Sequence, residues 1–142
     1  MNEPAVLVIE DDANDFFLLQ LAFEKLILPH KLVRVIDGEQ GLRYLKGEGA
    51  FADRSVFPFP ALVLLDIKMP RCDGFEVLER LKEDKTWNVP VVVLSGSALP
   101  EDKKRARKLG ATDYLVKEQT FDGVMGIVKS IQKKWLSGKK RP

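Results

Sequence analysis

The sequence predicts an α/β protein: a doubly wound parallel sheet covered by helices on both faces, as a three-layer sandwich. Short apolar runs rich in Val, Ile and Leu recur along the chain, separated by longer segments whose apolar residues lie three to four positions apart. The runs contain few polar residues, which indicates strands buried on both faces. The chain has 142 residues, of which 45% are hydrophobic, enough for the core of one domain.

The predicted strands and helices alternate along the chain, as in βαβ units. The five strands are expected at residues 5–9, 31–35, 61–65, 89–94 and 113–116. The apolar positions of the first three helices are Phe16, Leu19, Phe23, Leu26, Ile27, Leu42, Leu45, Phe75, Leu78 and Leu81. Because such helices are apolar along one side, they are expected to cover the sheet.

The last two helices have clear boundaries. The fourth should begin near Pro100, because the fixed φ of proline suits a first helical turn, and Gly110 should end it. Glu101 and Asp102 are favourable at the positive end of this helix. The fifth helix is expected at residues 121–136, with an apolar stripe of Val124, Ile127, Val128, Ile131 and Trp135.

The segment 47–60, GEGAFADRSVFPFP, interrupts this rhythm. Connections of this length are often functional or mobile, but we expect its phenylalanines to anchor it on the core. No repeat or change in composition marks a domain boundary. Residues 1–142 are therefore expected to form a single domain, with a core at about 4–136, a basic tail at 137–142 and no output domain.

Composition excludes several classes of protein. The net charge of +2 does not fit a strongly basic nucleic-acid binder, and the apolar runs are too short for a membrane span. We therefore expect neither a nucleic acid nor a membrane as a partner. The single cysteine, Cys72, excludes an internal disulfide, and the single histidine, His30, leaves too few ligands for a Cys/His zinc site. A secretory signal pattern is absent, so we expect a cytoplasmic location.

Carboxylates follow two of the predicted strands. Glu10, Asp11 and Asp12 follow the first, and Asp66 follows the third. In a flavodoxin-like sheet of order 2-1-3-4-5, these strands flank the point where the order reverses, and ligands bind beyond their carboxyl ends. The acids are therefore expected to meet in one crevice, where clustered carboxylates favour Mg²⁺.

A hydroxyl and an ammonium group follow the other two neighbouring strands. The fourth strand is followed by Ser95-Gly96-Ser97, and the fifth by Lys117. A cation, a hydroxyl, backbone N–H groups and an ammonium around one carboxylate form a site for a tetrahedral dianion.

These residues resemble the response-regulator receiver domain of two-component signalling. The resemblance covers almost the whole chain and is carried by four motifs at four strand ends: VLVIEDD at 6–12, LLDIKMPRCDGFEVL at 64–78, VVVLSGS at 91–97 and LGATDYLVK at 109–117. The connection YLKGEGAFADRSVFPFPALVLLD and the ending VKSIQKKWL are similar to the stand-alone regulators associated with cyanobacterial and bacterial phytochromes.

The resemblance implies roles for the residues at the strand ends. Asp66 would be the phosphoacceptor, forming an acyl phosphate (4-aspartylphosphate). Ser95 and Lys117 would contact the phosphoryl oxygens. Mg²⁺, with Mn²⁺ as a substitute, would be held by Asp11, Asp66, the backbone carbonyl of Lys68 and, through water, Glu10. Backbone N–H groups of Ile67, Lys68 and Gly96 would complete the cradle, and Asp12 would be a bystander.

The resemblance also implies a conformational switch. Ser95 and Tyr114 would move together when the hydroxyl of Ser95 approaches the phosphoryl group. Receivers usually have a proline after the lysine of the fifth strand, in a cis peptide, but Glu118 follows Lys117 here. We expect this bond to be trans, because a cis bond without proline costs roughly 3 kcal/mol.

The resemblance further implies partners. The donor would be a sensor histidine kinase, such as a bacteriophytochrome, and output would pass through protein contacts. A homodimer is expected through the face formed by the fourth helix, fifth strand and fifth helix. Such a receiver is a substrate that assists its own phosphorylation and dephosphorylation, and is not an enzyme in its own right.

Rival functions fit the residues less well. A flavodoxin-type flavin binder needs a phosphate loop after the first strand, where three carboxylates stand here. A phosphatase of the haloacid dehalogenase type needs a second aspartate two residues after the nucleophile, where Lys68 stands. A DNA-binding regulator would need a helix-turn-helix after the receiver.

Several residues have two open interpretations. Tyr114 either packs against the fourth helix or acts as the switch. Cys72 is either a small loop residue or a reactive thiol, and His30 is expected to be exposed and inert. The basic run 103–108 is either a solvated helix face or a docking face. Residues 1–99 carry a charge of −5 and residues 100–142 carry +7, so this run contributes to an uneven charge distribution.

Overall fold

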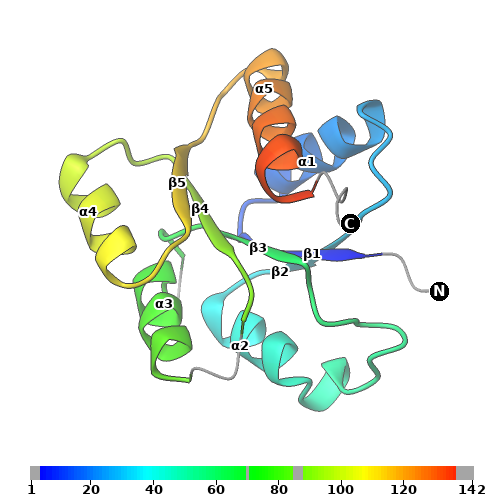
Figure 1. Cartoon of the computed structure of the whole chain (residues 1–142), viewed down its shortest axis with the longest axis vertical. Helices are drawn as coiled ribbons and strands as arrows, with labels where there is room; N and C mark the ends of the chain where they lie inside the picture. Colours follow the sequence, from blue (N-terminus) through cyan, green and yellow to red (C-terminus); the bar gives the residue numbers. More distant parts are fainter. Residues whose placement is uncertain (1–3, 70, 85–87, 137–142) are drawn as a thin grey trace.

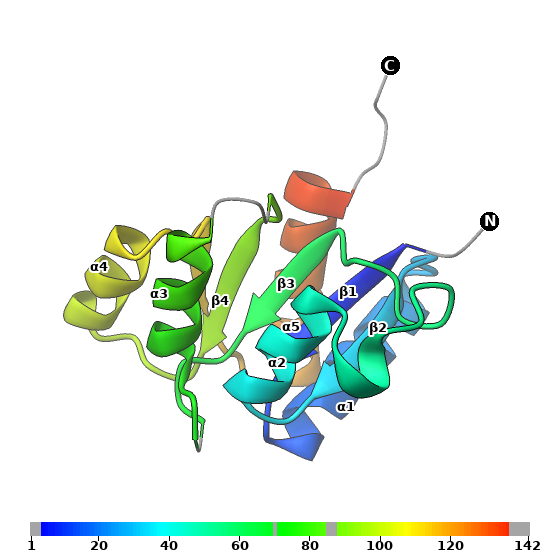
Figure 2. The same cartoon turned by 90° about the horizontal axis from the view of Figure 1, so that it is seen from below.

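The computed structural model describes residues 4–69, 71–84 and 88–136. Five parallel strands form one sheet in the order β2-β1-β3-β4-β5, as predicted. The strands are β1 (Ala5–Ile9), β2 (Lys31–Val35), β3 (Leu62–Leu65), β4 (Val91–Ser95) and β5 (Asp113–Val116). The sheet is the central layer of a three-layer sandwich (Figures 1 and 2).

The helices divide between the two faces of the sheet. They are α1 (Ala13–Lys25), α2 (Gly38–Lys46), α3 (Gly74–Glu83), α4 (Pro100–Lys108) and α5 (Phe121–Ile131). In Figure 1, α1 and α5 cover one face, and α2, α3 and α4 cover the other. The connection from β1 to β2 runs one way across the sheet and the later connections run the other way. Because such crossovers are right-handed, the connecting helices lie on both faces.

Successive residues of a strand pack into two separate hydrophobic cores, one on each face of the sheet. Along β1, Leu7 and Ile9 pack towards α2 and α3, whereas Val6 and Val8 pack towards α1 and α5. Successive side chains of a strand point to opposite faces, so a strand between two cores must be apolar at every position. All five residues of β1 are buried, as the unbroken apolar run predicted.

The strand boundaries differ slightly from the prediction. β1, β2 and β5 have the predicted limits, and β3 begins one residue later, at Leu62. β4 begins at Val91, two residues later than predicted, because Pro90 has no N–H for the ladder. It extends to Ser95, which pairs with Val116.

The first helix is shorter than its apolar pattern suggested. α1 ends at Lys25, and Ile27, which we had placed on the apolar side of the helix, has a φ of 53° and is 87% exposed. The N–H of Ile27 donates to the carbonyl of Glu24 in the turn that follows the helix. This turn carries the side chain of Ile27 away from the core, so helical spacing alone was misleading here.

The segment 47–60 is packed, as predicted. It contains a short 3₁₀ helix, η1 (Gly49–Phe51), and it passes the β2 edge of the sheet (Figure 2). Phe51 and Phe57 form an aromatic cluster with buried Tyr44, whose hydroxyl donates to the carbonyl of Pro58 at 2.8 Å. Lys31 of β2 donates to the carbonyl of Val56.

The last two helices follow their predicted limits. Gly110, just beyond α4, has a φ of 103°, a left-handed conformation that glycine adopts readily. α5 continues into a π-helical turn, η2 (Gln132–Leu136), so the helical path ends at the predicted residue. The basic tail expected at 137–142 lies outside the described residues. Within the described part of the chain, no helix is long and apolar enough to cross a membrane.

The lone histidine and lone cysteine are both more buried than a loop position suggests. His30 was expected to be exposed, which is wrong. Its ring is half-buried, Nδ1 has no hydrogen-bond partner among the described residues, and burial lowers its pKa. Cys72 is buried, and burial, together with the charges of Glu76 and Glu39, raises the pKa of its thiol to about 11. The interpretation of Cys72 as a small packing residue is therefore favoured over a reactive thiol.

Gly38 tests how closely α2 packs. Gly38 donates its N–H to the carbonyl of Cys72, and a Cβ there would overlap that carbonyl and lie 2.7 Å from Cγ2 of Val77. We expect Gly38→Ala to destabilise the fold by about 2 kcal/mol, because the backbone cannot move away cheaply. Urea unfolding followed by circular dichroism measures the change.

Gly126 provides the matched control. It lies in α5, and a Cβ there would meet no atom within 4 Å. Gly126→Ala should raise stability by about 0.5–1 kcal/mol, because alanine loses less conformational entropy in a helix than glycine. Equal effects of the two substitutions would contradict the close approach at Gly38.

Candidate functional site: an acidic cluster at the carboxyl edge of the sheet

The carboxyl ends of four strands meet at one edge of the sheet. Ile9 of β1 pairs with Leu65 of β3, so Glu10 and Asp66, the residues that follow them, leave the sheet side by side. The N–H of Asp66 donates to the carbonyl of Ile9 at 3.1 Å, which continues this register past the last strand residue. The N–H of Lys117 donates to the carbonyl of Ser95 at 2.7 Å in the same way.

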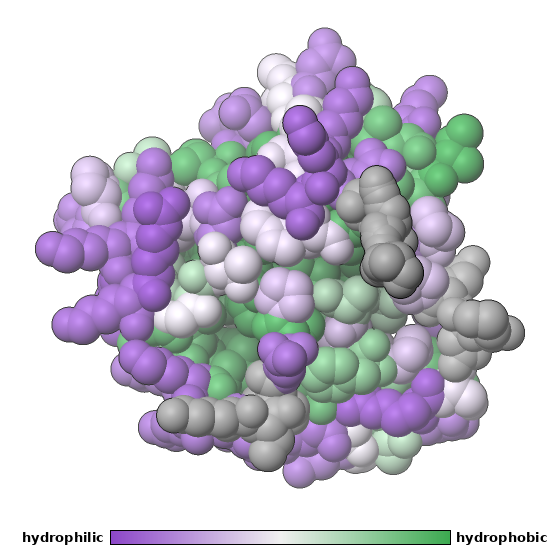
Figure 3. Space-filling model, in the orientation of Figure 1, coloured by the Kyte–Doolittle hydropathy of each residue, from purple (hydrophilic) through white to green (hydrophobic). Residues whose placement is uncertain are grey.

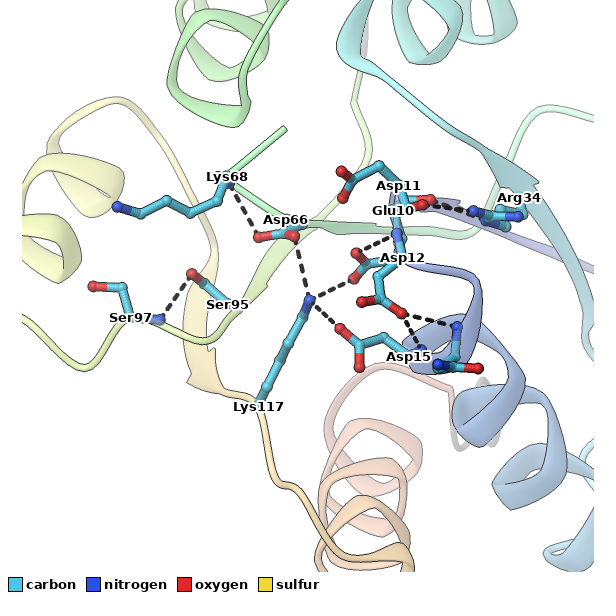
Figure 4. Close-up of polar contacts among 11 residues, drawn as sticks. Glu10, Asp11, Asp12, Asp15, Arg34, Asp66, Lys68, Ser95, Ser97 and Lys117 are labelled. Carbon is cyan, nitrogen blue, oxygen red and sulfur yellow. Dashed lines mark hydrogen bonds and ion pairs between the residues drawn. The ribbon is translucent and has the colours of Figure 1, made fainter. Parts of the chain in front are cut away.

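Three of the predicted acids form a compact cluster (Figure 4). One carboxylate oxygen each from Glu10, Asp11 and Asp66 lies within 4.8 Å of the others. Glu10 and Asp66 are buried, and Asp11 is exposed. Carboxylate oxygens are hard ligands, and an octahedral cation such as Mg²⁺ keeps several waters when it is bound by a few of them. An open cluster of this composition fits such a cation.

Lys117 lies at the centre of the site. Its Nζ is 2.8 Å from Oε1 of Glu10, 3.2 Å from Oδ2 of Asp66 and 2.6 Å from Oδ2 of Asp15. Its side chain is only 19% exposed, so the ammonium is held among the carboxylates (Figure 4). The described residues contain no cis peptide, so the Lys117–Glu118 bond is trans, as expected.

The cluster shifts the pKa values of two of its members. Burial raises the pKa of Glu10 to about 7, the hydrogen bond from Lys117 opposes this rise, and the charge on Asp66 adds to it. Burial by itself would lower the pKa of Lys117, but hydrogen bonds to Asp15 and Glu10 outweigh it and raise that pKa above its ordinary value. Lys117 is therefore a permanent cation, and Glu10 readily takes up a proton when no other cation balances the site.

The turn after β3 holds the carboxylate of Asp66 from its other side. The backbone N–H of Lys68 donates to Oδ1 of Asp66 at 3.1 Å. The Lys68 side chain extends away from Asp66 (Figure 4). A space of about 550 Å³ opens beside this carboxylate, and its lining includes Lys68, Gly96, Ser97 and Lys117. The space leaves ample room for a phosphoryl group next to Asp66.

Ser95 is fully buried, and its hydroxyl is engaged within its own loop. Oγ of Ser95 accepts a hydrogen bond from the N–H of Ser97 at 3.1 Å, rather than contacting Asp66. Tyr114 is buried as well, and its hydroxyl donates to the carbonyl of Ser97 at 2.7 Å. The loop after β4 therefore joins Ser95 to Tyr114 through the backbone of Ser97.

Asp12, expected to be a bystander, has a structural role. Its Oδ1 accepts hydrogen bonds from the N–H groups of Asn14 and Asp15, so it is the N-cap of α1. A side-chain oxygen at this position satisfies backbone donors that the helix leaves unpaired. The cap fixes how α1 leaves the acidic cluster.

Two further residues at the site were not singled out from the sequence. Arg34 of β2 donates from Nε to the carbonyl of Glu10 at 3.0 Å and from Nη2 to the carbonyl of Asp11 at 2.9 Å, which braces the end of β1. Asp15 of α1 contacts Lys117. An acid in a first helical turn and an arginine in a strand are ordinary features, so the sequence carries no signal for either role.

The arrangement combines nucleophile, cation site and charge balance. A carboxylate with one free face lies beside an ammonium, a backbone N–H and two acids suited to a divalent cation. Negative charge that arrives on the Asp66 carboxylate would be met from several sides. Such a site suits the transfer of a phosphoryl group, whose transition state depends mainly on positioning and charge stabilisation.

Comparison with known proteins agrees with this chemistry. Two curated relatives are similar over nearly the whole chain. The probable methanogenesis regulatory protein FilR2 of Methanothrix harundinacea is 34% identical and covers 96% of this chain and 86% of its own length. The response regulator Rcp1 of Synechocystis is 31% identical, and the match covers 95% of this chain and 91% of Rcp1.

Solved structures are also similar over nearly the whole chain. The phosphorylated cyanobacterial phytochrome response regulator RcpA superposes with a TM-score of 0.88, at 35% identity, covering 99% of each chain. The response regulator RPA3017, from red light signaling of R. palustris, superposes with a TM-score of 0.90, at 36% identity, covering 98% of each chain. The Mn²⁺-bound form of Rcp1 superposes with a TM-score of 0.85, at 29% identity, covering 98% of this chain and 99% of the Rcp1 chain.

A family comparison covers the same region. Residues 6–129 match the family described as the response regulator receiver domain, a span that includes β1 from its second residue, the other four strands in full and the whole acidic cluster. The predicted strand order is also the observed one. The chain therefore belongs to the response-regulator receiver family, and its similar structures include a cyanobacterial phytochrome response regulator and a response regulator in red light signaling.

Proposed function

We propose that this single receiver domain accepts a phosphoryl group on Asp66 from a sensor histidine kinase and signals through protein contacts. One observation carries the proposal: the buried carboxylate of Asp66 lies 3.2 Å from the ammonium of Lys117 and within a cluster of acids suited to a divalent cation. Membership of the receiver family supports it.

The residues divide the work of phosphoryl transfer. An Asp66 oxygen forms a bond to phosphorus while the bond between phosphorus and the donor nitrogen breaks, and the donor imidazole takes a proton as it leaves. Glu10, Asp11, Asp66 and the backbone carbonyl of Lys68 would hold the cation. Mg²⁺, or Mn²⁺ in its place, would neutralise phosphoryl oxygens as charge builds up on them.

Lys117 and the loop after β4 would complete the phosphoryl site. Lys117 already reaches Asp66, so a small shift would bring its ammonium to a phosphoryl oxygen. The hydroxyl of Ser95 and the N–H of Gly96 border the same edge of the sheet, where they would donate to the remaining oxygens. Because Lys117 is already held beside Asp66 at a strand end, its ammonium would need little reorganisation at the moment of transfer.

We further propose that Ser95 and Tyr114 form the switch. To reach a phosphoryl oxygen, the hydroxyl of Ser95 must leave the N–H of Ser97, which also changes the backbone that holds the hydroxyl of Tyr114. The loop after β4 and the start of α4 are then free to take a second arrangement. The contact between Tyr114 and Ser97 favours the switch interpretation over simple packing against α4.

The kinase that we propose is a phytochrome-type histidine kinase. The chain is similar over nearly its full length to RcpA, a cyanobacterial phytochrome response regulator, and to RPA3017, a response regulator in red light signaling. We propose that phosphorylation changes the contacts of this chain with another protein. One such contact would be a second copy of the chain.

The face made by α4, β5 and α5 is the surface that we propose for a homodimer. Hydrophilic residues gather over α4 in Figure 3. Arg107 of α4 and Lys134 of η2 both pair with Asp113 of β5, at 3.7 Å and 3.6 Å, so ionic contacts join the elements of this face. A two-fold interface would use the same patch on both copies.

The phosphoacceptor is tested by transfer from candidate kinases and from acetyl phosphate in the presence of Mg²⁺. We expect label on the wild type and none on Asp66→Asn, because the amide is not a nucleophile of comparable strength. Asp73→Asn is a matched control, because Asp73 caps α3 and lies outside the acidic cluster. Label that persists in Asp66→Asn, or a wild type that no donor labels, contradicts the proposal.

The protonation of Glu10 gives a pH prediction for the metal-free protein. Its pKa is about 7 in the folded state against an ordinary 4.5, so the folded protein holds this proton more tightly than the unfolded chain. The contribution of Glu10 to stability is therefore greatest below about pH 4.5 and is lost as the pH rises through about 7, by on the order of 3 kcal/mol.

Urea unfolding of the wild type and of Glu10→Gln in chelator, across this pH range, measures that contribution. The stability of the wild type should fall with rising pH relative to the variant. Added Mg²⁺ should stabilise the wild type more above pH 7 than below pH 6, because the deprotonated carboxylate is the better ligand. Parallel pH curves for the two proteins would show that Glu10 does not titrate in this window.

The homodimer is tested by light scattering with and without beryllofluoride, a phosphoryl mimic. We expect twice the mass of one chain in the presence of the mimic, and a return to the mass of one chain in Arg107→Glu, which reverses a charge on the proposed face. Lys25→Glu, on α1, is the matched control and should stay dimeric. A monomer at high concentration in both conditions overturns the proposed dimer.

A further inference from the structure

Asp15 points into the phosphoryl site although it belongs to a helix. It occupies the first turn of α1, where its N–H donates to Oδ1 of Asp12 at 3.1 Å. Its own carboxylate turns towards Lys117 and approaches it to 2.6 Å, the shortest of the three contacts of that ammonium (Figure 4). The capped turn holds the backbone of Asp15, and the contact with Lys117 gives its side chain a direction.

The ammonium of Lys117 has no donor to spare. An ammonium has three N–H groups, and three carboxylates lie within hydrogen-bond distance, from Asp15, Glu10 and Asp66. Glu10 and Asp66 are members of the acidic cluster, whereas Asp15 is not. The three partners therefore differ in what else they have to bind.

Glu10 and Asp66 must change partners during the proposed reaction. A cation in the cluster engages both carboxylates, and a phosphoryl group consumes one oxygen of Asp66. Each event removes a partner from Lys117 at the moment when its ammonium must be in place. Asp15 is the one partner of the three that neither event engages.

We propose that Asp15 is the positioning residue of Lys117, a carboxylate that keeps the ammonium at the edge of the site while its other two partners are taken up by the cation and the phosphoryl group. The inference rests on the proposed function, which it deepens. The hydrogen bond to Asp15 limits where Nζ can go, so a donor that Glu10 or Asp66 releases would stay beside the space next to Asp66. Asp15 touches no reacting atom and acts through Lys117.

A purely helical role for Asp15 predicts something different. An acid in a first turn interacts favourably with the positive end of the helix. Its neutralisation would then lower stability slightly and leave the site unchanged. Positioning predicts a change at Lys117 itself, whatever happens to the stability of the helix.

The first measurement follows the ammonium of Lys117 in the metal-free protein by ¹⁵N NMR, with Lys117→Arg to assign the signal. Slow proton exchange makes the ammonium visible when it is held in ion pairs. We expect this signal in the wild type, and a broadened or shifted signal in Asp15→Asn. Glu24→Gln, which neutralises an exposed acid on the same helix, should match the wild type.

The second measurement is the rate of Asp66 labelling by acetyl phosphate at saturating Mg²⁺, where weaker cation binding cannot lower the rate. Asp15→Asn should be slower by about tenfold, because a charge-assisted hydrogen bond is lost. Asp15→Glu should recover part of the rate, because it restores the carboxylate. Glu24→Gln should label at the wild-type rate.

The outcomes separate this inference from the proposed function. A wild-type rate in Asp15→Asn at saturating Mg²⁺ overturns the inference, as does a loss of rate that disappears when Mg²⁺ is raised to saturation. A wild type that is never labelled overturns the proposed function instead. The NMR signal then decides about Asp15 alone, and an unchanged Lys117 signal in Asp15→Asn rejects its role.

Discussion

The ion pairs of Lys117 with buried carboxylates are the interaction on which the site depends. Glu10 and Asp66 are almost fully buried, and two carboxylates in such a place would repel each other and lose their water without compensation. Lys117 follows β5 and provides that compensation, because its ammonium reaches both Glu10 after β1 and Asp66 after β3. A divalent cation would also compensate the charge of these carboxylates. This explains why a site that receives a negatively charged group is built from acids around one ammonium.

The parallel sheet determines where these charges can meet. Every strand enters from the same end, so the residues after β1, β3, β4 and β5 converge on one edge, and both cores stay free of charge. The packing that surrounds this edge is tight: Gly38 admits no side chain, and Arg34 binds the carbonyls of Glu10 and Asp11. The site is therefore braced on the β1 side, and on the β4 side Ser95 and Tyr114 of β5 both bond to the backbone of Ser97.

Most of the fold and the centre of the site could be predicted from sequence, because strand ends are easy to locate. Glu10, Asp11, Asp66 and Lys117 each follow an apolar run, and the topology brings strand ends together. Errors arose where local pattern and tertiary packing disagree. Ile27 continues a helical spacing but lies beyond the end of α1, and His30 is half-buried although it lies in the connection between α1 and β2.

The sequence by itself determined the number of strands, their order, and which chemical groups stand at the carboxyl edge of the sheet, because each depends on short-range pattern and on general rules of chain topology. Only the tertiary structure decided which carboxylates hold Lys117. Asp15 and Lys117 are 102 residues apart, and their contact depends on how α1 leaves its cap and how far β5 lies from it. A first-turn acid has the same local pattern whether it faces water or an ammonium, so its role is decided by distances between elements that are remote in the chain.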